Sequence, residues 1–361
     1  MRFLSIKKIA KEAGVSTATV SRVLNNPGYK CSSEELRERI WKIARELNYM
    51  PNEAARSLKK GITDTSQKVW YLDVLMTRTG NLETDPFFSE LLRVIESEIH
   101  RQGCILMHIF HQPLLSNDRK CWTENIDKVI AQMEPDGEIR SDGLIIIGKC
   151  NDNVLKKLSA KYKSIVSVNR NSTNYLVDEV ICDGKRIAAM AVEYLIGLGH
   201  RKIGYVGDCH NESRYKGYQD TLFQYGIDID ISFVIEAEHT EAEGYAVMER
   251  LIQRGDAPTA IYCANDMIAI GMLKCLNKYK NRYYVPSIIS SDDIEEAQYT
   301  KPMLTTVRLP KEEMGKFALY LLIDRLGGGH KGIVRTELEG KLMIRESCTL
   351  VENANRMEYY I

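Results

Sequence analysis

The segment from Ser5 to Asn26, SIKKIAKEAGVSTATVSRVLNN, constrains the fold of this chain more than any other. Apolar residues recur in its first part at positions i, i+3, i+4 and i+7, which predicts a helix that buries one face. These residues are Ile6, Ile9, Ala10 and Ala13. Gly14 can adopt the positive φ that ends such a helix, and the hydroxyl of Ser16 can cap the start of a second one.

The second helix is predicted from Thr17 onward. Val20, Val23 and Leu24 would face the first helix, which leaves a polar and small-residue face exposed. That face consists of Thr17, Ala18, Ser21, Arg22 and Asn25. Two short helices joined by a tight turn form a helix-turn-helix, whose second helix is a candidate reader of base edges in DNA.

Charge is divided unevenly along the chain, although the formal net charge is zero. Residues 1–61 contain 13 Lys and Arg against 6 Asp and Glu, whereas the remaining residues contain 36 against 43. The N-terminal part therefore has a net charge of +7 and the rest a net charge of −7. A basic segment on an acidic body is expected where only that segment approaches phosphates.

A third helix and a linker complete the N-terminal part. Ser32 and Glu35 fit a capping box, and an apolar helical stripe follows them. The stripe is Leu36, Ile40, Ile43, Ala44 and Leu47. Pro51 disfavours helix at the residue before it, so we predict an all-α helix-turn-helix domain at residues 1–50. Residues 51–61 are predicted to be a hinge that becomes helical only on DNA, because so short a helix is unstable alone.

Residues 62–361 alternate apolar runs with helical patterns. Strands are predicted at 69–76, 104–110, 143–148, 164–168, 202–206 and 260–263, and helices at 87–102, 125–133 and 185–198. Strands interleaved with helices form parallel sheets that are covered on both faces. Because the pattern is too long for one ordinary sheet, we expect two doubly wound α/β lobes with a cleft between them.

Several other classes of protein fit the sequence poorly. The nine cysteines are scattered without a C-x-x-C pair, which indicates reduced thiols. No apolar run reaches bilayer length and the N-terminus lacks an apolar signal segment, so we expect a soluble cytoplasmic protein. His108 and His111 have no cysteine or carboxylate cluster beside them, which disfavours a metal site. Asp292 and Asp293 are adjacent on a strand end and should point apart, which disfavours a hydrolytic carboxylate pair.

Several motifs occur in the order typical of one family. They are IAKEAGVSTATVSRVLNN, then NYMPN at residues 48–52 and ARSL at 55–58, followed by DPFFSELLRVIE, YLIGLGHRKIGYVG, CANDMIAIG, MLTTVRLP and GKLMIRES. The chain thus resembles the lac-repressor/galactose-repressor (LacI/GalR) family of bacterial transcription regulators over essentially its whole length. The resemblance implies a homodimer whose heads bind a pseudo-palindromic operator in double-stranded DNA. It also implies a core similar to periplasmic sugar-binding proteins.

The resemblance also implies which residues contact DNA. Thr17, Ala18 and Arg22 match base-contacting positions, and an arginine can form a fork onto guanine or clamp a phosphate. Leu58 matches the family's leucine that wedges into the minor groove, and Lys59 matches the cation that follows it. A merely solvated face is the alternative for Thr17 and Arg22. The full expected set is Ser5, Ser16, Thr17, Ala18, Ser21, Arg22, Asn25, Asn52, Ala55, Leu58 and Lys59.

Effector binding is implied at a second set of positions. Polar groups that can pair with sugar hydroxyls and aromatic rings that can stack on a sugar are typical of such a site. The expected effector-binding residues are Phe87, Phe88, Asn169, Arg214, Asn265 and Asp292. Core packing is the alternative for Phe87 and Phe88. Ser291 replaces the aromatic residue common in the family before the Asp292 position, so the resemblance does not identify a particular sugar.

The favoured interpretation is a sequence-specific, cytoplasmic, nucleoid-associated regulator, most simply a repressor of carbohydrate-utilisation genes, under allosteric control by a sugar-like effector. We expect it to use no cofactor, to catalyse no reaction and to bind no membrane. One alternative is a catabolite-control regulator that responds mainly to a phosphoprotein partner. A solute-binding protein for transport and a carbohydrate-active enzyme are the others; the basic head and the lack of a signal segment disfavour the transport protein.

Overall fold

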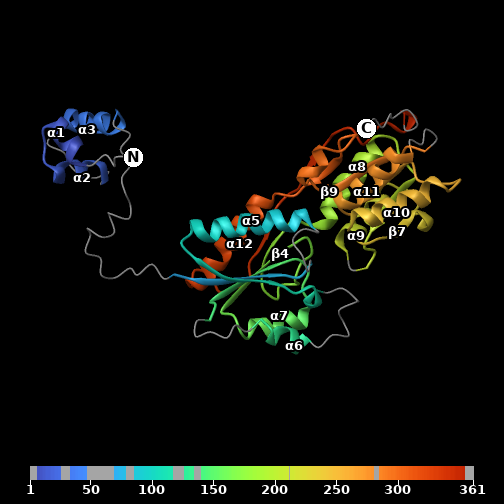
Figure 1. Ribbon diagram of the computed structural model, residues 1–361, viewed down its shortest axis with the longest axis horizontal. Helices are drawn as coiled ribbons and strands as arrows, with labels where there is room; N and C mark the ends of the chain where they lie inside the picture. The colour runs from blue at the N-terminus through green and yellow to red at the C-terminus, as the bar shows by residue number, and fades with distance from the viewer. Residues whose placement is uncertain are drawn as a thin grey trace. The chain divides into compact units, whose positions relative to one another are not determined.

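The computed structural model describes residues 6–25, 33–46, 69–78, 85–116, 126–133, 140–210, 212–279 and 284–353. Its contacts divide the chain into two units, residues 1–68 and residues 69–361, which are described separately (Figure 1). No described helix has the length and apolar character needed to cross a bilayer.

The first unit contains three helices, α1 (Ile6–Ala13), α2 (Thr17–Asn25) and α3 (Glu34–Glu46). As the periodicity predicts, its buried core includes Ile9, Ala10, Ala13, Val20, Val23 and Ile40. Gly14 has a φ of +69°, which most residues with a side chain avoid, and the Ser16 hydroxyl accepts a hydrogen bond from the Thr19 N–H at 3.1 Å. The predicted turn and cap are confirmed.

The predicted capping box of the third helix is wrong by one residue. The hydroxyl of Ser33 caps α3, since it accepts from the Leu36 N–H at 3.2 Å, while Ser32 lies outside the described residues. The two serines are adjacent and equally suitable by type, so the sequence alone could not decide between them. With Ser33 as the cap, Glu35 does not occupy the position that a capping box requires.

The second unit consists of two α/β lobes. Sheet A, in the N-lobe, has the strand order β11-β5-β4-β3-β1-β2. Its strands are β1 (Tyr71–Met76), β2 (Ile105–His111), β3 (Gly143–Ile147), β4 (Ser164–Asn169), β5 (Asp178–Ile181) and β11 (Arg335–Glu337), all parallel. Helices α5 (Pro86–Arg101) and α12 (Lys311–Leu326) cover one face. Helices α6 (Ile126–Ala131) and α7 (Asp152–Ser159) cover the other.

Sheet B, in the C-lobe, has the order β12-β10-β9-β8-β6-β7. Its strands are β6 (Ile203–Gly207), β7 (Val234–Glu236), β8 (Ala260–Cys263), β9 (Ser287–Asp292), β10 (Thr305–Arg308) and β12 (Lys341–Met343), of which only β12 is antiparallel. The helices are α8 (Gly184–Gly197), α9 (Ser213–Gln224), α10 (Glu241–Ile252) and α11 (Asp266–Tyr279). Right-handed crossovers in opposite directions place α9 and the pair α10–α11 on opposite faces.

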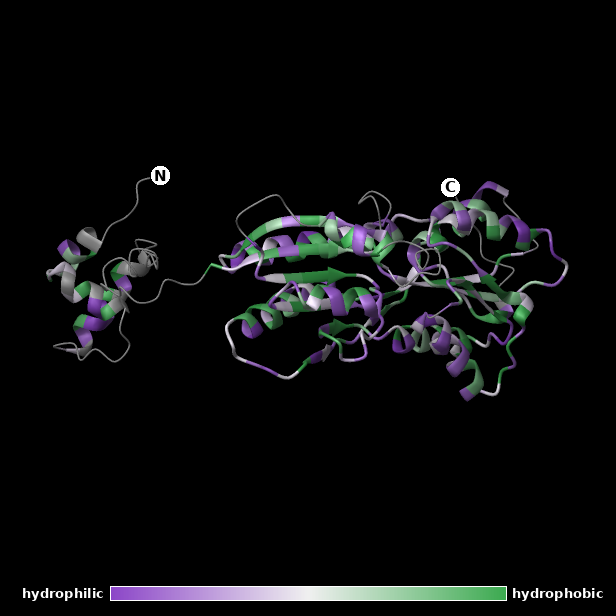
Figure 2. Ribbon diagram, turned by 90° about the horizontal axis from the view of Figure 1, so that it is seen from below, coloured by the Kyte–Doolittle hydropathy of each residue, from purple (hydrophilic) through white to green (hydrophobic). Residues whose placement is uncertain are grey.

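The chain passes between the lobes three times. It leaves the N-lobe after β5, returns after β10 to form α12 and β11, and leaves again to form β12. Two of these crossings lie side by side, since the Leu338 N–H donates to the Ile181 carbonyl at 2.8 Å. Short 3-10 helices occur at Pro113–Leu115, Ile231–Phe233, Glu295–Gln298 and Val351–Asn353. Figure 2 shows mainly hydrophobic colours along the strands of both sheets.

The two-lobed, parallel α/β core predicted from the sequence is confirmed. All six predicted strands are present within two residues of their expected bounds, as are the three predicted helices. The strands that the sequence reading omitted are β5, β7, β9, β10, β11 and β12. Several of these strands are only three or four residues long, and β9 has the sequence SIISSD, so they lack the continuous apolar run that marks the central strands.

Candidate functional site

Polar side chains from both lobes meet where the parallel strands end. In sheet A, β1 lies between β3 and β2, so the strand connections on its two sides run in opposite directions along the sheet. In sheet B, β6 lies in the same way between β8 and β7. Such switch points in open α/β sheets leave a crevice beyond the carboxyl ends of the strands, where ligands bind. Arg78 follows β1, Lys149 follows β3 and Arg170 follows β4, while Asp208 follows β6 and Asn265 follows β8.

Arg214 is the most completely buried cation of this site, with 1% of its surface exposed. It lies in the first turn of α9, where its Nε is 3.0 Å from Glu212 Oε1 and its Nη1 donates to the carbonyl of Ala264. Burial alone would raise the pKa of Glu212, but Arg214 and Lys149 hold it well below its usual range. Glu212 is therefore ionised and fixes the guanidinium within the C-lobe.

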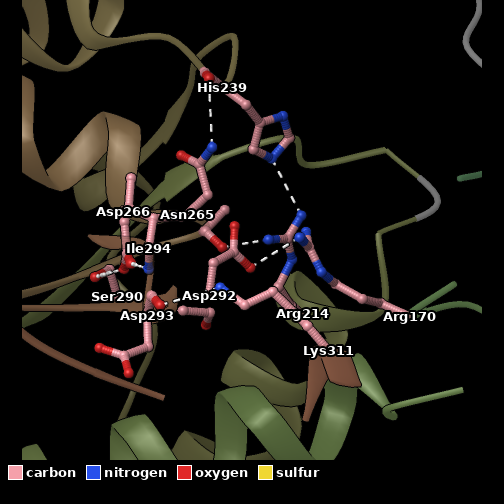
Figure 3. Close-up of polar contacts among 12 residues, drawn as sticks. Arg170, Arg214, His239, Asn265, Asp266, Ser290, Asp292, Asp293, Ile294 and Lys311 are labelled. Carbon is pink, nitrogen blue, oxygen red and sulfur yellow. Dashed lines mark hydrogen bonds and ion pairs between the residues drawn. The ribbon is translucent and has the colours of Figure 1, made fainter. Parts of the chain in front are cut away.

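Asp292 and Arg170 form an ion pair between the lobes, with 2.8 Å between Asp292 Oδ1 and Arg170 Nη2 (Figure 3). Burial raises the pKa of Asp292 to about 6, against the opposing effect of Arg170 and Arg214. Asp292 has a φ of 129°, in the region that favours glycine. A non-glycine residue in this conformation has a strained backbone, and such strain is found where the direction of a side chain is functionally required.

Asp266 supports the turn that carries Asp292. Its carboxylate accepts from the Ser290 and Thr306 hydroxyls at 2.6 Å each and from the Ile294 N–H at 2.8 Å (Figure 3). Burial, followed by the charge of Asp292, raises the pKa of Asp266 to about 7. Asp266 thus connects α11 to the end of β9 and to β10, and it restrains the backbone just after Asp292.

Asp293, the next residue, points elsewhere. Its Oδ1 is 2.5 Å from Arg345 Nη2 and its Oδ2 is 2.5 Å from Arg308 Nε. The two neighbouring carboxylates therefore have different partners, and both residues have a positive φ, 129° for Asp292 at the end of β9 and 50° for Asp293 just beyond it. They do not form the close pair that a glycoside hydrolase uses.

His239, just beyond β7, lies between two arginines. Its Nδ1 contacts Arg78 Nη2 and its Nε2 is 3.2 Å from Arg214 Nη2. Burial and then the charges of Arg78 and Arg214 lower the pKa of His239 well below its usual range, so the ring is neutral. Its carbonyl accepts from Asn265 Nδ2 at 3.3 Å (Figure 3).

Three cations of the N-lobe contact groups of the C-lobe at the site. Arg170 pairs with Asp292, and Arg78 contacts His239. Lys149 Nζ lies 3.3 Å from Asp208 Oδ2 and 3.1 Å from Glu212 Oε2. The polar site is therefore also a place where the two lobes contact each other.

The structure brings together Arg214, Asn265 and Asp292, three of the residues that the sequence singled out for effector binding. Asn265 also caps α11, since its Oδ1 accepts from the Ile268 N–H at 3.1 Å. Asn169 lies at the end of β4, and its Oδ1 accepts from the Arg170 N–H at 2.8 Å. Both side chains therefore have structural partners within their own lobes.

Phe87 and Phe88, which were expected to stack against an effector or to pack in the core, are both buried. Phe87 and Phe88 are 2% and 6% exposed, with ring centroids 5.2 Å apart. The guanidinium of Arg170 lies 4.4 Å from the Phe87 centroid, a cation–π contact. Arg170, rather than a bare ring, is thus presented to the boundary between the lobes.

Sequence reasoning missed several residues of the site. They are Arg78, Lys149, Arg170, Glu212 and His239, which lie in segments just after strands. Charged residues immediately after predicted strands were the available signal, because the carboxyl ends of parallel strands meet at one edge of a sheet. Arg170 directly follows Asn169, which the sequence did select.

Residues expected to contact DNA occupy one face of α2 as far as they are described. Thr17 and Arg22 are exposed, opposite the buried Val20 and Val23. Ala18, Ser21 and Asn25 belong to the same helix, while Ser16 is its cap. The remaining predicted residues lie outside the described part of the chain, namely Ser5, Asn52, Ala55, Leu58 and Lys59.

The sequence disfavoured a metal site at His108 and His111, and His108 contacts a buried aspartate. His108 Nδ1 is 3.0 Å from Asp73 Oδ1, and Tyr162 donates to the other oxygen of Asp73 at 2.8 Å. Within the described ranges, no group of three or more His, Cys, Asp or Glu side chains is placed to hold a metal ion. This arrangement makes Asp73 a buried hydrogen-bonding centre of sheet A.

Two family models match the sequence. Residues 5–52 match "Bacterial regulatory proteins, lacI family", and residues 192–348 match "Periplasmic binding protein-like domain". Among curated relatives, the HTH-type transcriptional repressor MelR of Bacillus subtilis is 30% identical over 357 residues, which cover 95% of this chain and 97% of that one. The HTH-type transcriptional repressor PurR of Haemophilus influenzae is 29% identical over 359 residues, covering 95% and 98%.

Solved structures with the same fold include regulators with bound ligands. A complex of the transcriptional regulator CelR with cellobiose has a TM-score of 0.65 at 24% identity and covers 96% of this chain and 100% of that one. The lac repressor dimer bound to operator and the anti-inducer ONPF has a TM-score of 0.63 at 22% identity, with the same coverage. At these identities the similarity establishes the shared architecture.

Proposed function

The chain belongs to the LacI family of bacterial regulatory proteins, and from this premise we propose that it is a transcriptional repressor whose DNA affinity is set by a sugar-like effector bound between its lobes. The observation that carries the effector role is the buried polar constellation around Arg214 and Asp292, at the switch points of both sheets. A ligand held there contacts both lobes and so favours one arrangement of them.

The DNA-binding part of the proposal rests on α2. Its exposed Thr17 and Arg22 are suited to base-edge and phosphate contacts, and the net charge of +7 over residues 1–61 suits a phosphate-rich partner. Two heads of a homodimer would bind the halves of a pseudo-palindromic operator. The hinge at residues 51–61, with Leu58 as a minor-groove wedge and Lys59 beside it, would couple the heads to the core.

Coupling of about 1–3 kcal/mol between the effector site and the DNA site would be ordinary for such a switch. Both named relatives are transcriptional repressors, and the genes regulated by this protein are proposed to serve carbohydrate use. The protein would catalyse no reaction and would act in the cytoplasm at the nucleoid. The acids of the site support this, because Glu212 and Asp292 are engaged by Arg214 and Arg170 rather than paired for proton transfer.

The proposal can be tested in two steps with the full-length protein. A thermal-shift screen against mono- and disaccharides and their derivatives should find a compound that raises the melting temperature, because a ligand of the folded core stabilises it by mass action. An operator selected from random duplex DNA should then change its affinity about tenfold when that compound is added, a coupling within the usual range.

The variant Arg214→Ala should abolish both the thermal shift and the change in operator affinity while leaving ligand-free DNA binding measurable. Arg254→Ala is a matched control, since this exposed arginine donates to the Ser232 carbonyl on the surface of the C-lobe. A full ligand response in Arg214→Ala would contradict the proposed site. Recovery of a phosphoprotein that controls operator binding, together with no response to any small molecule, would favour the catabolite-control alternative.

A further inference from the structure

Three guanidinium groups converge on His239, two of them from the N-lobe and one from the C-lobe. Arg78 and Arg214 contact the ring directly, and Arg170 also acts on its charge. Figure 3 shows the guanidinium groups of Arg170 and Arg214 side by side, with the Asp292 carboxylate on one side of them and the His239 ring on another. Guanidinium groups only donate hydrogen bonds, so this region is rich in donors.

The histidine ring cannot satisfy both of its arginine neighbours. A neutral imidazole has one nitrogen that accepts and one that carries a proton, whereas both ring nitrogens of His239 face guanidinium nitrogens. One of the two contacts is therefore donor against donor. The site contains at least one N–H group that lacks an acceptor from this ring.

Arg170 provides a second, independent observation of the same kind. Its side chain is only 9% exposed, and its Nε has no hydrogen-bond partner although the atom is buried. Its Nη2 pairs with Asp292, and its face lies against Phe87. A buried guanidinium N–H without an acceptor is costly, which makes it a place where an incoming acceptor binds well.

Two of the nearby carboxylates already form ion pairs with cations of the site, and a third does not. Glu212 is held by Arg214 and Lys149, whereas Asp292 Oδ1 forms an ion pair with Arg170 but is itself a buried atom without a hydrogen bond. Asp85, at the start of α5, feels the charges of Arg170, Arg78 and Arg214, yet forms no ion pair with any residue in the described ranges. Burial raises its pKa, so Asp85 is a weak competitor for the same three cations.

From these contacts we infer that the effector carries an acidic group, a carboxylate or a phosphate, which is bound by Arg78, Arg170 and Arg214 where His239 now faces two donors. This inference deepens the proposed function and rests on it. An anionic acceptor can accept from the arginine N–H that faces His239 and from the Nε of Arg170. It also connects the lobes directly, because Arg78 and Arg170 belong to the N-lobe and Arg214 to the C-lobe. A sugar acid or a sugar phosphate fits this requirement, whereas a neutral sugar leaves it unmet.

The test uses the full-length protein and matched pairs of ligands. Thermal shifts and titration calorimetry would compare glucose, glucuronate and glucose 6-phosphate, with inorganic phosphate as the bare anion and potassium chloride to match ionic strength. A saturable shift is expected with at least one of glucuronate, glucose 6-phosphate and inorganic phosphate, at concentrations where glucose gives none. A response to glucuronate alone identifies a carboxylate site, and a response to the two phosphates alone identifies a phosphate site.

Two variants give opposite expected changes. Arg78→Gln removes one guanidinium from an incompletely buried position and should weaken acidic-ligand binding by about tenfold or more, as expected for a charge-assisted hydrogen bond. Asp85→Asn removes the competing carboxylate and should strengthen binding several-fold. Arg250→Gln is the control, because this exposed arginine donates to the Ala246 carbonyl of its own helix.

The results separate this inference from the proposed function. A neutral sugar that binds at Arg214 and changes operator affinity, with acidic sugars inactive, overturns the acidic effector and leaves the regulator intact. No saturable response to phosphate or to either acidic sugar also overturns it. Equal binding in the parent protein and in Arg78→Gln places the anion elsewhere and overturns it as well.

Discussion

The two lobes contribute to the shared site in different ways. On the C-lobe, Arg214 is fixed by Glu212 and the Ala264 carbonyl, and Asp292 by the turn that Asp266 restrains. On the N-lobe, the side chains of Lys149 and Arg78 contact groups across the boundary, on the C-lobe. The C-lobe half is therefore organised in advance, while the N-lobe cations depend on the approach of the lobes.

This difference suggests an order of events. A ligand can meet a finished set of groups on the C-lobe first, and the N-lobe cations then respond to its presence. Preorganised groups contribute affinity with little ordering cost, whereas groups that rearrange convert binding into a change of shape. Substitutions on the C-lobe should therefore affect stability most, and substitutions on the N-lobe should mainly affect closure.

The largest effect is expected for Glu212→Gln. This change leaves buried Arg214 without its carboxylate and weakens the hold on Lys149, so we expect a loss of about 3–5 kcal/mol in the free energy of unfolding, typical of a broken buried ion pair. Urea unfolding followed by circular dichroism would measure it. Glu296→Gln, at an exposed position, is the control and should change stability by less than about 0.5 kcal/mol.

A loss of similar size in both variants would contradict the view that the C-lobe half is preorganised around Glu212. A small loss in Glu212→Gln alone would mean that Arg214 finds other acceptors readily. Either result would weaken the comparison between the lobes, because the N-lobe and C-lobe groups would then be equally adaptable.

An intermediate effect is expected in the pH dependence of stability. Burial raises the pKa of Asp266 to about 7 and that of Asp292 to about 6, both above the ordinary value of 3.8 for an aspartate. Each group then favours folding most when protonated, so its contribution to stability falls as pH rises from about 4 to its folded-state pKa and is constant above it. Each contributes a slope of up to about 1.4 kcal/mol per pH unit in that interval.

The variant Asp266→Asn should flatten this slope between pH 5 and pH 7, measured as the urea midpoint at each pH, in comparison with the parent protein. Exposed Asp228→Asn should retain it. An unchanged slope in Asp266→Asn would show that Asp266 is already ionised at pH 5 in the folded protein, as its three hydrogen-bond donors would favour.

The smallest effect on stability is expected for Lys149→Gln. Glu212 keeps Arg214 as a partner in this variant, so the loss should be about 1.5–3 kcal/mol, the value of a hydrogen bond to a charged group. The lobes should nevertheless separate more easily, which small-angle X-ray scattering would detect as a larger radius of gyration. Lys157→Gln, which breaks an exposed N-lobe pair with Asp127, should leave the radius unchanged and cost at most about 1 kcal/mol.

The sequence predicted well what local periodicity determines. The helix-turn-helix depends on apolar residues three and four positions apart and on Gly14, so its core and its turn were predictable from twenty consecutive residues. The central strands were predictable because both of their faces are buried. The cap of α3 was not, since Ser32 and Ser33 differ only in register.

The site was predictable only in part, for a physical reason. Resemblance indicated Arg214, Asn265 and Asp292, but no local pattern connects Arg78, Lys149 or Arg170 with them. These cations lie more than a hundred residues from their partners or in a different lobe, and only the three crossings bring them together. Phe87 shows the same limit, because the sequence placed it correctly at the start of α5 without revealing that Arg170 covers its ring.

The three crossings between the lobes also determine how the core can be divided. The C-lobe is not a continuous segment, since β12 reaches it only after α12 and β11 have been added to the N-lobe. A protease that cuts the backbone at one crossing would leave the two fragments interlocked through the others. A chimaera that exchanges effector specificity with a relative would have to transfer residues 184–308 together with β12. Residues 184–308 alone would leave sheet B without its edge strand β12, and β12 alone would lack the strands with which it pairs.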